Sequence, residues 1–346
     1  MGASSFHKLV VAQPEKYGAG RLSLLHERFP ELEESLPSIR LGSAPTPVRR
    51  LPELGTGSAE IWLKDESVFG DGGWGGNKVR KLEWLIPEAK RRGRSTILTV
   101  GGLGTNWGLA CALYGREHGL KTVLALIDQP VDEHVNQQLE RLERSGAEIH
   151  FTHTKARTVV AVVGLMIRHR PYFLPAGGSS AIGALGGTEI ALELAAQVAR
   201  GELPEPSYVV TAVGSGGTAA GLLLGLELAG LDTKVLAVVV NDTLRLDSKT
   251  LLSLAGQSAR LLRRRGAPLP DVNLDGERLF VVEDQIGAGY GHPTESARRA
   301  AEEVSDRTGI NLDPVYTAKA MAGVLSAERT LGPGPVVFID TNGPRD

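Results

Sequence analysis

The sequence contains little of what marks secreted, membrane-spanning or nucleic-acid-binding proteins. Its 346 residues include one cysteine, Cys111, so no disulfide can form within the chain. No apolar run approaches the ~20 residues of a transmembrane helix, and residues 1–16 lack the apolar core of a secretory signal. The net charge is -2, whereas a protein that binds a phosphate backbone needs a basic surplus. We therefore expect a cytoplasmic protein that binds neither nucleic acid nor membranes.

Several common cofactor signatures are also absent from the sequence. No cluster of His, Cys and Asp shows the spacing of metal ligands, so we expect no metal in the chemistry. The P-loop pattern G-x-x-x-x-G-K-[ST] does not occur. The run Gly214-Ser215-Gly216 lacks the full dinucleotide fingerprint, because Ala219 stands where the third glycine would be. Nucleoside triphosphates and dinucleotides are thus disfavoured as cofactors.

Glycine, in contrast, is abundant, with 43 residues. Many glycines lie in loops between apolar runs, where a residue without Cβ lets the backbone approach a ligand. Such loops occur at residues 70–76, 101–104, 177–187 and 214–217. Each lies at or near the end of a predicted strand, and ligands of doubly wound sheets bind at the carboxyl ends of strands. We expect these loops to converge on one cleft.

The spacing of apolar residues predicts strands that alternate with amphipathic helices. One series has strands at 95–100, 122–127, 148–152 and 172–174 and helices at 105–118, 131–145 and 156–168. The rest of the chain has strands at 60–64, 208–213, 234–240 and 336–340 and helices at 22–34, 77–92, 187–200, 217–229, 248–264, 293–308 and 318–331. Such alternation is typical of parallel βαβ units. We predict an α/β protein of two doubly wound domains, a small one at 95–174 and a large one at 1–94 plus 175–346.

The segment 213–218, Val-Gly-Ser-Gly-Gly-Thr, follows a predicted strand and begins a predicted helix. Free backbone N–H groups and the helix dipole make such a position an anion site. Gly214, Gly216 and Gly217 let the backbone approach a phosphate, and Ser215 and Thr218 add hydroxyl donors. The pattern favours a phosphate-binding loop, and the alternative is a tight strand-to-helix turn that binds no ligand.

The segment 75–83, GGNKVRKLE, places Lys78, Arg80 and Lys81 in the first turn of a predicted helix, where the dipole disfavours positive charge. Neighbouring cations lower the pKa of a lysine, because they penalise its protonated form. A neutral amine is what Schiff-base chemistry requires. Together with a phosphate loop, this segment favours a lysine that binds pyridoxal phosphate (PLP). A solvated basic turn is the alternative.

Several motifs occur in the order and spacing of a known family. They are GGNKVRKLE at 75–83, GGLGTNWG at 101–108, AGGSSAIGALGG at 176–187, GSGGT at 214–218, and the pair GAGYG at 287–291 and LDPVYTAKAMAG at 312–323. The chain resembles the fold-type II PLP-dependent enzymes, which are tryptophan synthase β-like. Within these it resembles the D-cysteine desulfhydrase and 1-aminocyclopropane-1-carboxylate (ACC) deaminase family. The resemblance implies PLP in a cleft between the two domains, and a homodimer.

For the cofactor, the resemblance implies that Lys78 is the Schiff-base lysine, which also moves protons at the substrate α-carbon. Asn77 would donate to the phenolic oxygen of the cofactor, and Lys81 would reach its phosphate. The phosphate cup would comprise Gly214, Ser215, Gly216, Gly217 and Thr218. Thr317 stands where the deaminases carry a glutamate at the pyridine nitrogen, and Thr341 matches a threonine of the desulfhydrases. We expect one of these two hydroxyls, rather than a carboxylate, to face that nitrogen.

For the substrate, Thr105 and Asn106 match a Ser-Asn pair that holds the substrate carboxylate and the cofactor. Tyr290 and Tyr316 match two tyrosines near the substrate. Trp107 departs from the pattern because relatives carry a polar side chain there, and we expect its indole to narrow the substrate site. A plain helix cap at Thr105 and plain packing of Tyr316 are the alternatives.

These features predict a PLP-dependent lyase or deaminase that acts on a small amino acid. β-Elimination, which gives a keto acid and ammonia, fits best. β-Replacement and cyclopropane ring opening are the alternatives within the fold. A catalytically silent amino-acid-binding homologue is an alternative of a different class, and the intact Lys78 argues against it.

Overall fold

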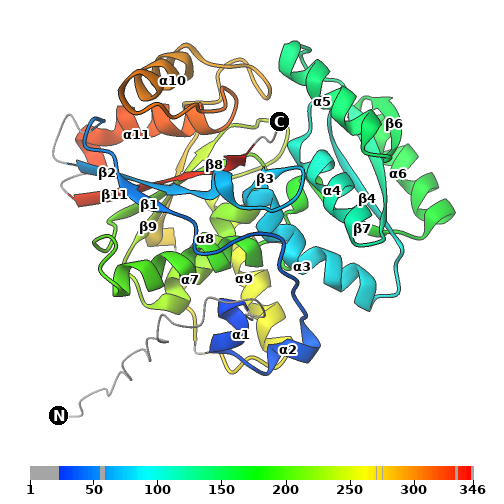
Figure 1. Cartoon of the computed structure of the whole chain (residues 1–346), viewed down its shortest axis with the longest axis horizontal. Helices are drawn as coiled ribbons and strands as arrows, with labels where there is room; N and C mark the ends of the chain where they lie inside the picture. The colour runs from blue at the N-terminus through cyan, green and yellow to red at the C-terminus, as the bar shows by residue number, and fades with distance from the viewer. Residues whose placement is uncertain (1–22, 55–58, 270, 275, 332–333, 344–346) are drawn as a thin grey trace.

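Two β-sheets with helices on both faces organise the chain in the computed structural model (Figure 1). It describes residues 23–54, 59–269, 271–274, 276–331 and 334–343. The predicted α/β fold is confirmed: apart from one antiparallel edge strand, the strands of both sheets run parallel. None of the helices in the described part has the length and apolar character needed to cross a membrane.

The larger sheet has the strand order β1-β2-β11-β8-β9-β10, and only β1 is antiparallel to its neighbour. The bounds are β1 (Val48–Arg50), β2 (Ala59–Asp65), β8 (Tyr208–Val213), β9 (Lys234–Val239), β10 (Leu279–Val282) and β11 (Gly334–Asp340). Val209 and Val235 pack with helices α7 (Leu185–Ala199) and α8 (Gly217–Ala229). Val210 and Leu236 pack with α10 (Glu295–Thr308) and α11 (Thr317–Leu331) on the other side. Helices thus cover both faces of the sheet, and alternate strand residues are buried on opposite faces. This explains the nearly continuous apolar runs of these strands.

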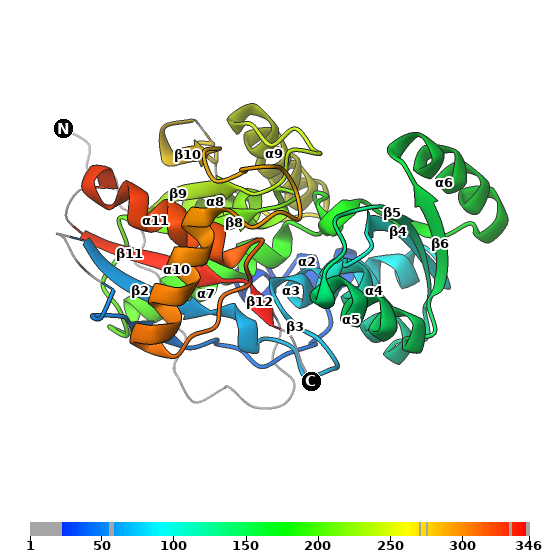
Figure 2. The ribbon, with the colours of Figure 1, turned by 90° about the horizontal axis from the view of Figure 1, so that it is seen from above.

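The smaller sheet has the order β6-β5-β4-β7, and all its neighbours are parallel. Its strands are β4 (Thr96–Gly102), β5 (Lys121–Ile127), β6 (Glu148–His153) and β7 (Tyr172–Leu174). Helices α4 (Asn106–Glu117) and α5 (Glu133–Arg144) cover one face, and α6 (Lys155–His169) covers the other. Figure 2 shows this unit at one end of the molecule. Its strands lie within residues 95–174, and the exact domain boundaries stay a prediction.

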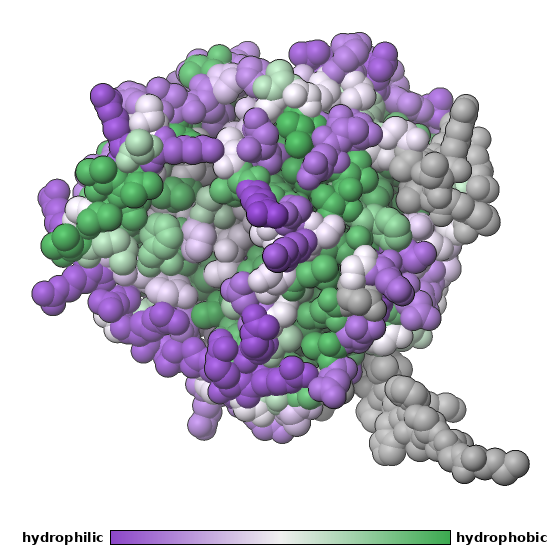
Figure 3. Space-filling view, turned by 180° about the vertical axis from the view of Figure 1, so that it is seen from behind, coloured by the Kyte–Doolittle hydropathy of each residue, from purple (hydrophilic) through white to green (hydrophobic). Residues whose placement is uncertain are grey.

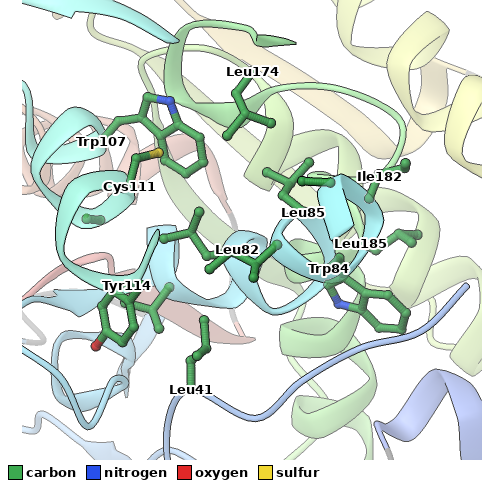
Figure 4. Close-up of a cluster of buried hydrophobic side chains, with 14 of the residues drawn as sticks. Leu41, Leu82, Trp84, Leu85, Trp107, Cys111, Tyr114, Leu174, Ile182 and Leu185 are labelled. Carbon is green, nitrogen blue, oxygen red and sulfur yellow. The ribbon is translucent and has the colours of Figure 1, made fainter. Parts of the chain in front are cut away.

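Helix α3 (Asn77–Arg91) connects the two units and carries the predicted Schiff-base lysine in its first turn. Leu82, Trp84 and Leu85 of this helix are buried in a core that also includes side chains of α4 and α7 (Figure 4). Just before α3, β3 (Gly75–Gly76) pairs with β12 (Asn342–Gly343). Gly76 has φ 93°, and a Cβ there would lie 2.5 Å from the Thr341 carbonyl oxygen. The start of α3 is therefore fixed against the C-terminal segment.

Some predicted elements were wrong in detail. Over its described part, the helix predicted at 22–34 is two short helices, α1 (Leu24–Arg28) and α2 (Leu32–Ser35). Pro30 separates them, because proline lacks the N–H that would continue a helix. The strand at 336–340 is not the last one, since β12 follows it. The short strands β1, β3, β10 and β12 were not predicted. In contrast, the helix predicted at 248–264 is confirmed as α9 (Ser248–Arg264), with matching bounds.

Candidate active site

A cavity of about 320 Å³ lies where strands of both sheets end. Gly101 and Gly102 line it from the end of β4, Ile127 from the end of β5, Val213 from the end of β8, and Thr341 directly follows β11. This is the position where doubly wound sheets bind ligands. The Gly-rich loops around 101, 177 and 214 contribute to its wall. The loop 70–76 does not, contrary to the expected convergence, and packs against the Tyr114 ring instead.

One end of the cavity has the features of an anion site. Gly216 is the residue before α8, and its φ of 86° is a backbone conformation that glycine adopts readily. Residues 214–218 line this part of the cavity. Amides in the first turn of a helix lack intrahelical partners. The Gly217 N–H donates to Ser179 Oγ at 2.9 Å, and Ser179 Oγ in turn donates to Ser215 Oγ at 2.8 Å. A Cβ on Gly177 would lie 2.1 Å from Ser215 Oγ, so glycine is required where the two loops meet.

Lys81 brings a positive charge to this end of the cavity. Its Nζ donates to the Gly177 carbonyl oxygen at 2.9 Å, and a Cβ on Gly217 would lie 3.3 Å from the same Nζ. Burial lowers the pKa of Lys81 to about 7, and the neighbouring charge of Lys78 acts in the same direction. A buried ammonium without a nearby carboxylate is stabilised when an anion binds. The Lys81 amine and the start of α8 could therefore hold an anion such as a phosphate between them.

Lys78 lies one turn before Lys81 and faces the same cavity. Burial lowers the pKa of Lys78 to about 8, although the carboxylate of Asp313 acts in the opposite direction. Its Nζ donates to Asn77 Oδ1 at 3.4 Å and lies 5.5 Å from the centre of the Tyr316 ring. The Asn77 Nδ2 donates to Thr218 Oγ1 at 2.8 Å, which ties the start of α3 to the start of α8. The Lys78 amine thus lies at a fixed distance from the start of α8. Its lowered pKa makes it largely neutral above pH 8.

Two tyrosines that line the cavity form a hydrogen-bonded pair near Lys78. Tyr290 Oη and Tyr316 Oη are 2.7 Å apart, and burial raises the pKa of both phenols. The Tyr290 N–H donates to Asp242 Oδ1, and the Tyr316 N–H donates to Asp313 Oδ1. The raised pKa values keep both phenols protonated at neutral pH. The pair can therefore donate a proton to a group bound in the cavity.

The start of α4 forms the wall that the small sheet contributes. Thr105 Oγ1 accepts from the Gly108 N–H, so this residue is a helix cap, and it also lines the cavity. Asn106 is held from two sides: its Oδ1 accepts from Gln138 Nε2 at 2.6 Å, and its Nδ2 donates to Asn342 Oδ1 at 3.2 Å. The positive end of the helix dipole faces the cavity here, which suits a carboxylate.

Two predicted site residues lie differently from expectation. Trp107 borders the cavity, but its side chain is only 3% exposed, packs in the core beside Cys111, and donates from Nε1 to Thr99 Oγ1 at 2.8 Å (Figure 4). Its role is therefore chiefly packing rather than occupation of substrate space. Thr317 does not line the cavity, because its hydroxyl accepts from the Asp313 N–H at the start of α11. Thr341 does line it, so only this hydroxyl remains a candidate partner of a ring nitrogen.

Sequence reasoning missed several cavity residues. Asn241, just after β9, donates from Nδ2 to the Gly214 carbonyl oxygen and so fixes the glycine-rich loop at 214–217. Its place at the carboxyl end of a strand was a usable signal. Lys155 at the start of α6 lines the cavity and donates to the Thr243 carbonyl oxygen at 2.9 Å, linking the two units. No sequence pattern marks Lys155, since only the packing of α6 brings it to the cavity.

The residues present fit a phosphorylated aldehyde such as PLP. The anion site and Lys81 match a phosphate, and Lys78 offers an amine with a lowered pKa in the same cavity. The glycines at 177 and 217 leave the space that a Cβ would fill. In the described part of the chain, no Asp or Glu lines the cavity, so its charged side chains are the cations Lys78, Lys81 and Lys155.

Comparison with known proteins agrees with this geometry. The sequence profile of the family described as pyridoxal-phosphate dependent enzymes matches residues 39–342. D-cysteine desulfhydrase of Salmonella choleraesuis (strain SC-B67) is 34% identical over 331 residues, which cover 91% of this chain and 94% of the relative. The same enzyme of Salmonella newport (strain SL254) is 33% identical with the same coverage.

Solved structures show the same relationship. An ACC deaminase homologue superposes with a TM-score of 0.75 at 28% identity, covering 91% of this chain and 95% of the other. A threonine deaminase shares the fold, with a TM-score of 0.65 at 21% identity and coverage of 94% and 99%. The resemblance inferred from the motifs is confirmed, and the chain belongs to the fold-type II family of pyridoxal-phosphate dependent enzymes.

Proposed function

We propose that this protein is a PLP-dependent lyase that eliminates a β-substituent from a small amino acid, with Lys78 as the residue that carries PLP. The observation that carries the proposal is the position of the Lys78 amine, whose pKa is lowered to about 8, in one cavity with the anion site at the start of α8. The similarity to D-cysteine desulfhydrases supports this reaction class. The overall reaction takes one water and gives a keto acid, ammonia and the protonated leaving group.

The phosphate of PLP would be held by Lys81, the hydroxyls of Ser215 and Thr218, and the amides of Gly216 and Gly217. When bound, PLP withdraws electrons from the substrate α-carbon, which acidifies its C–H bond. The anion site and the amine are fixed to each other by the Asn77–Thr218 hydrogen bond. A ligand held at both points therefore has little freedom to rotate, which orients its reacting atoms.

Proton transfer would fall to the Lys78 amine and to the tyrosine pair, which line the same cavity. The Lys78 amine would accept the α-proton of the substrate in its neutral form, which predominates above its pKa of about 8. Tyr290 and Tyr316, both with raised pKa values, remain protonated and can donate to the leaving group. The base and the acid thus lie close together in the cavity, with the Lys78 Nζ 5.5 Å from the centre of the Tyr316 ring.

The substrate carboxylate would bind at the start of α4, where Asn106 is held by Gln138 and Asn342. Thr341 is the hydroxyl that would face the pyridine nitrogen. A hydroxyl does not hold that nitrogen protonated as a carboxylate would, because it brings no negative charge next to the ring. A weaker electron sink favours reactions in which a β-substituent leaves promptly, and this supports elimination over ring opening.

The proposal is tested by reconstitution with PLP and a screen of D- and L-amino acids that carry β-leaving groups. Keto acid and ammonia should appear together, in equal amounts, and only with β-substituted substrates. Lys78→Ala should abolish turnover, while Lys81→Gln should raise the PLP concentration needed for half-maximal activity. Release of ammonia from ACC but from no β-substituted amino acid would contradict elimination, and PLP binding without any turnover would favour a binding protein.

A further inference from the structure

Gln138 is a polar side chain on the buried side of helix α5. Val135 and Leu142 lie on the same side of this helix, and all three side chains are buried. The same unit leaves Val160 and Ile167 of α6 exposed, and the view from behind shows an apolar area at that end of the molecule (Figure 3). Burial of an amide costs free energy unless its hydrogen bonds are satisfied. The bonds that Gln138 makes, rather than its packing, therefore explain its place.

Gln138 belongs to a chain of hydrogen bonds that passes through the candidate active site. Arg141 Nη1 donates to Gln138 Oε1 at 3.3 Å, and Gln138 Nε2 donates to Asn106 Oδ1 at 2.6 Å. Asn106 Nδ2 in turn donates to Asn342 Oδ1 at 3.2 Å, which links α4 to the C-terminal segment. We call these four side chains the amide relay. Of the four, Asn106 lines the cavity.

The guanidinium at the outer end of the amide relay fixes its direction. An amide has an oxygen on one side and an NH2 group on the other, so it fits its surroundings in either of two orientations. A guanidinium can only donate, so Gln138 must turn its oxygen to Arg141 and its NH2 group to Asn106. Asn106 must then accept with its oxygen. Its NH2 group is left for Asn342 and for the cavity.

We propose that Gln138 is a positioning residue that makes the substrate site specific for a carboxylate, because it sets Asn106 to donate into the cavity. The inference rests on the proposed function in one respect, which is that the substrate carboxylate binds at the start of α4. The Asn106 NH2 group has two N–H donors, and Asn342 Oδ1 accepts from one of them. The second is left for an acceptor in the cavity. A reversed Asn106 would place its oxygen there and repel a carboxylate.

Burial makes the direction of the amide relay strict. The exposed fraction is 0% for Gln138 and 6% for Asn106, so bulk water does not compete for their hydrogen bonds. An Asn106 amide turned the other way would bring two NH2 groups together at 2.6 Å, where the low dielectric of the interior makes unpaired polar groups costly. The cavity lysines attract an anion from any direction, whereas a directed N–H group also orients it.

The test compares the binding of alanine and of alaninamide, in both chiralities, to the PLP-loaded protein. The two ligands differ in the group that faces Asn106, which is a carboxylate in one and a neutral amide in the other. Alanine has no β-leaving group, so its Kd is read from the absorbance change of bound PLP and does not depend on turnover. Wild type should bind alanine at least about tenfold more tightly than alaninamide. Equal binding of the two would overturn the proposal.

Gln138→Glu keeps the shape of the side chain but can only accept, so Asn106 must turn its NH2 group toward it and its oxygen toward the cavity. The Kd of alanine should rise at least about 30-fold, and that of alaninamide should change by less than about threefold. Gln137→Glu adds the same charge on the exposed side of α5 and is the matched control, which should change neither Kd. Arg141→Met removes the fixed donor and should lower the preference for alanine severalfold, which tests the relay even if Gln138→Glu does not fold.

A double-mutant cycle separates the direction of Asn106 from the added charge. In an Asn106→Ala background no amide is left to turn, so Gln138→Glu should change the Kd of alanine by less than about threefold. A full-sized effect in that background, or an equal loss of alanine and alaninamide binding in Gln138→Glu alone, would overturn the proposed role. Failure of the elimination reaction gives neither result, because a protein that binds alanine yet eliminates no β-substituent contradicts the proposed function alone.

Discussion

The rate at which the apoenzyme captures PLP should depend on pH through the Lys78 amine. Only the neutral amine attacks an aldehyde, so the rate follows the deprotonated fraction of this side chain. Burial lowers the pKa of Lys78 from 10.5 to about 8. A base with a lowered pKa gains its neutral form at lower pH, so the rate should level off above about pH 9 rather than continue to rise to pH 10.

The size of the effect follows from the shift. At pH 7 a lysine with a pKa of about 8 is roughly 10% neutral, whereas one with a pKa of 10.5 is roughly 0.03% neutral. Capture at pH 7 should therefore be about 300-fold faster than for an exposed lysine of equal intrinsic reactivity. Between pH 9 and 10 the rate should change by less than about 20%, against about eightfold for an unshifted amine.

Stopped-flow absorbance at the wavelength of lysine-bound PLP measures this rate. A simple alkylamine, measured over the same pH range, corrects for the titration of PLP itself. Lys78→Ala should show no covalent capture, and Lys81→Gln should keep the pH profile while binding PLP more weakly. A wild-type rate that still rises severalfold per pH unit above pH 9 would show that the cavity does not lower the pKa of Lys78.

Three further substitutions test individual parts of the site. Gly217→Ala, whose Cβ would lie 2.7 Å from Ser179 Oγ, should raise the Kd of PLP at least about tenfold without changing the far-UV circular dichroism, as fluorescence titration can check. Trp107→Phe, which removes the donor to Thr99 Oγ1, should lower the free energy of unfolding by about 1 kcal/mol in urea and change kcat/KM by less than about threefold. A loss of kcat/KM well above threefold, with little change in the free energy of unfolding, would show that the indole contributes to the substrate site. Tyr290→Phe should lower kcat about 10- to 100-fold with little effect on PLP affinity, if its phenol assists the leaving group.

Features that depend on residues close together in the chain could be predicted from the sequence alone. The segment 213–218 predicts an anion site because a glycine run between an apolar strand and a helix has few other structural uses. Lys78 is placed by its position in the first turn of α3, and burial then shifts its pKa in the direction that the neighbouring cations suggested. Most predicted site residues line one cavity for the same reason: they follow strands whose carboxyl ends meet.

Features set by packing between distant segments could not be predicted in this way. Trp107 is the second residue of α4, and whether it points to the cavity or to the core depends on the rotation of that helix against β4. Thr317 is used by its own helix start, which a motif comparison does not reveal. Lys155 reaches the cavity only because α6 packs beside the large unit, where Thr243 accepts from its amine.

The most direct test of the central claim is to find which lysine carries PLP. Borohydride reduction of the PLP-loaded protein makes the lysine–cofactor bond permanent, and peptide mapping by mass spectrometry then locates the added group. The geometry predicts one modified residue, Lys78, in the peptide that contains Asn77, with Lys81 unmodified. Modification of Lys81 or of Lys155 instead would contradict the assignment of the catalytic lysine and the mechanism that depends on it.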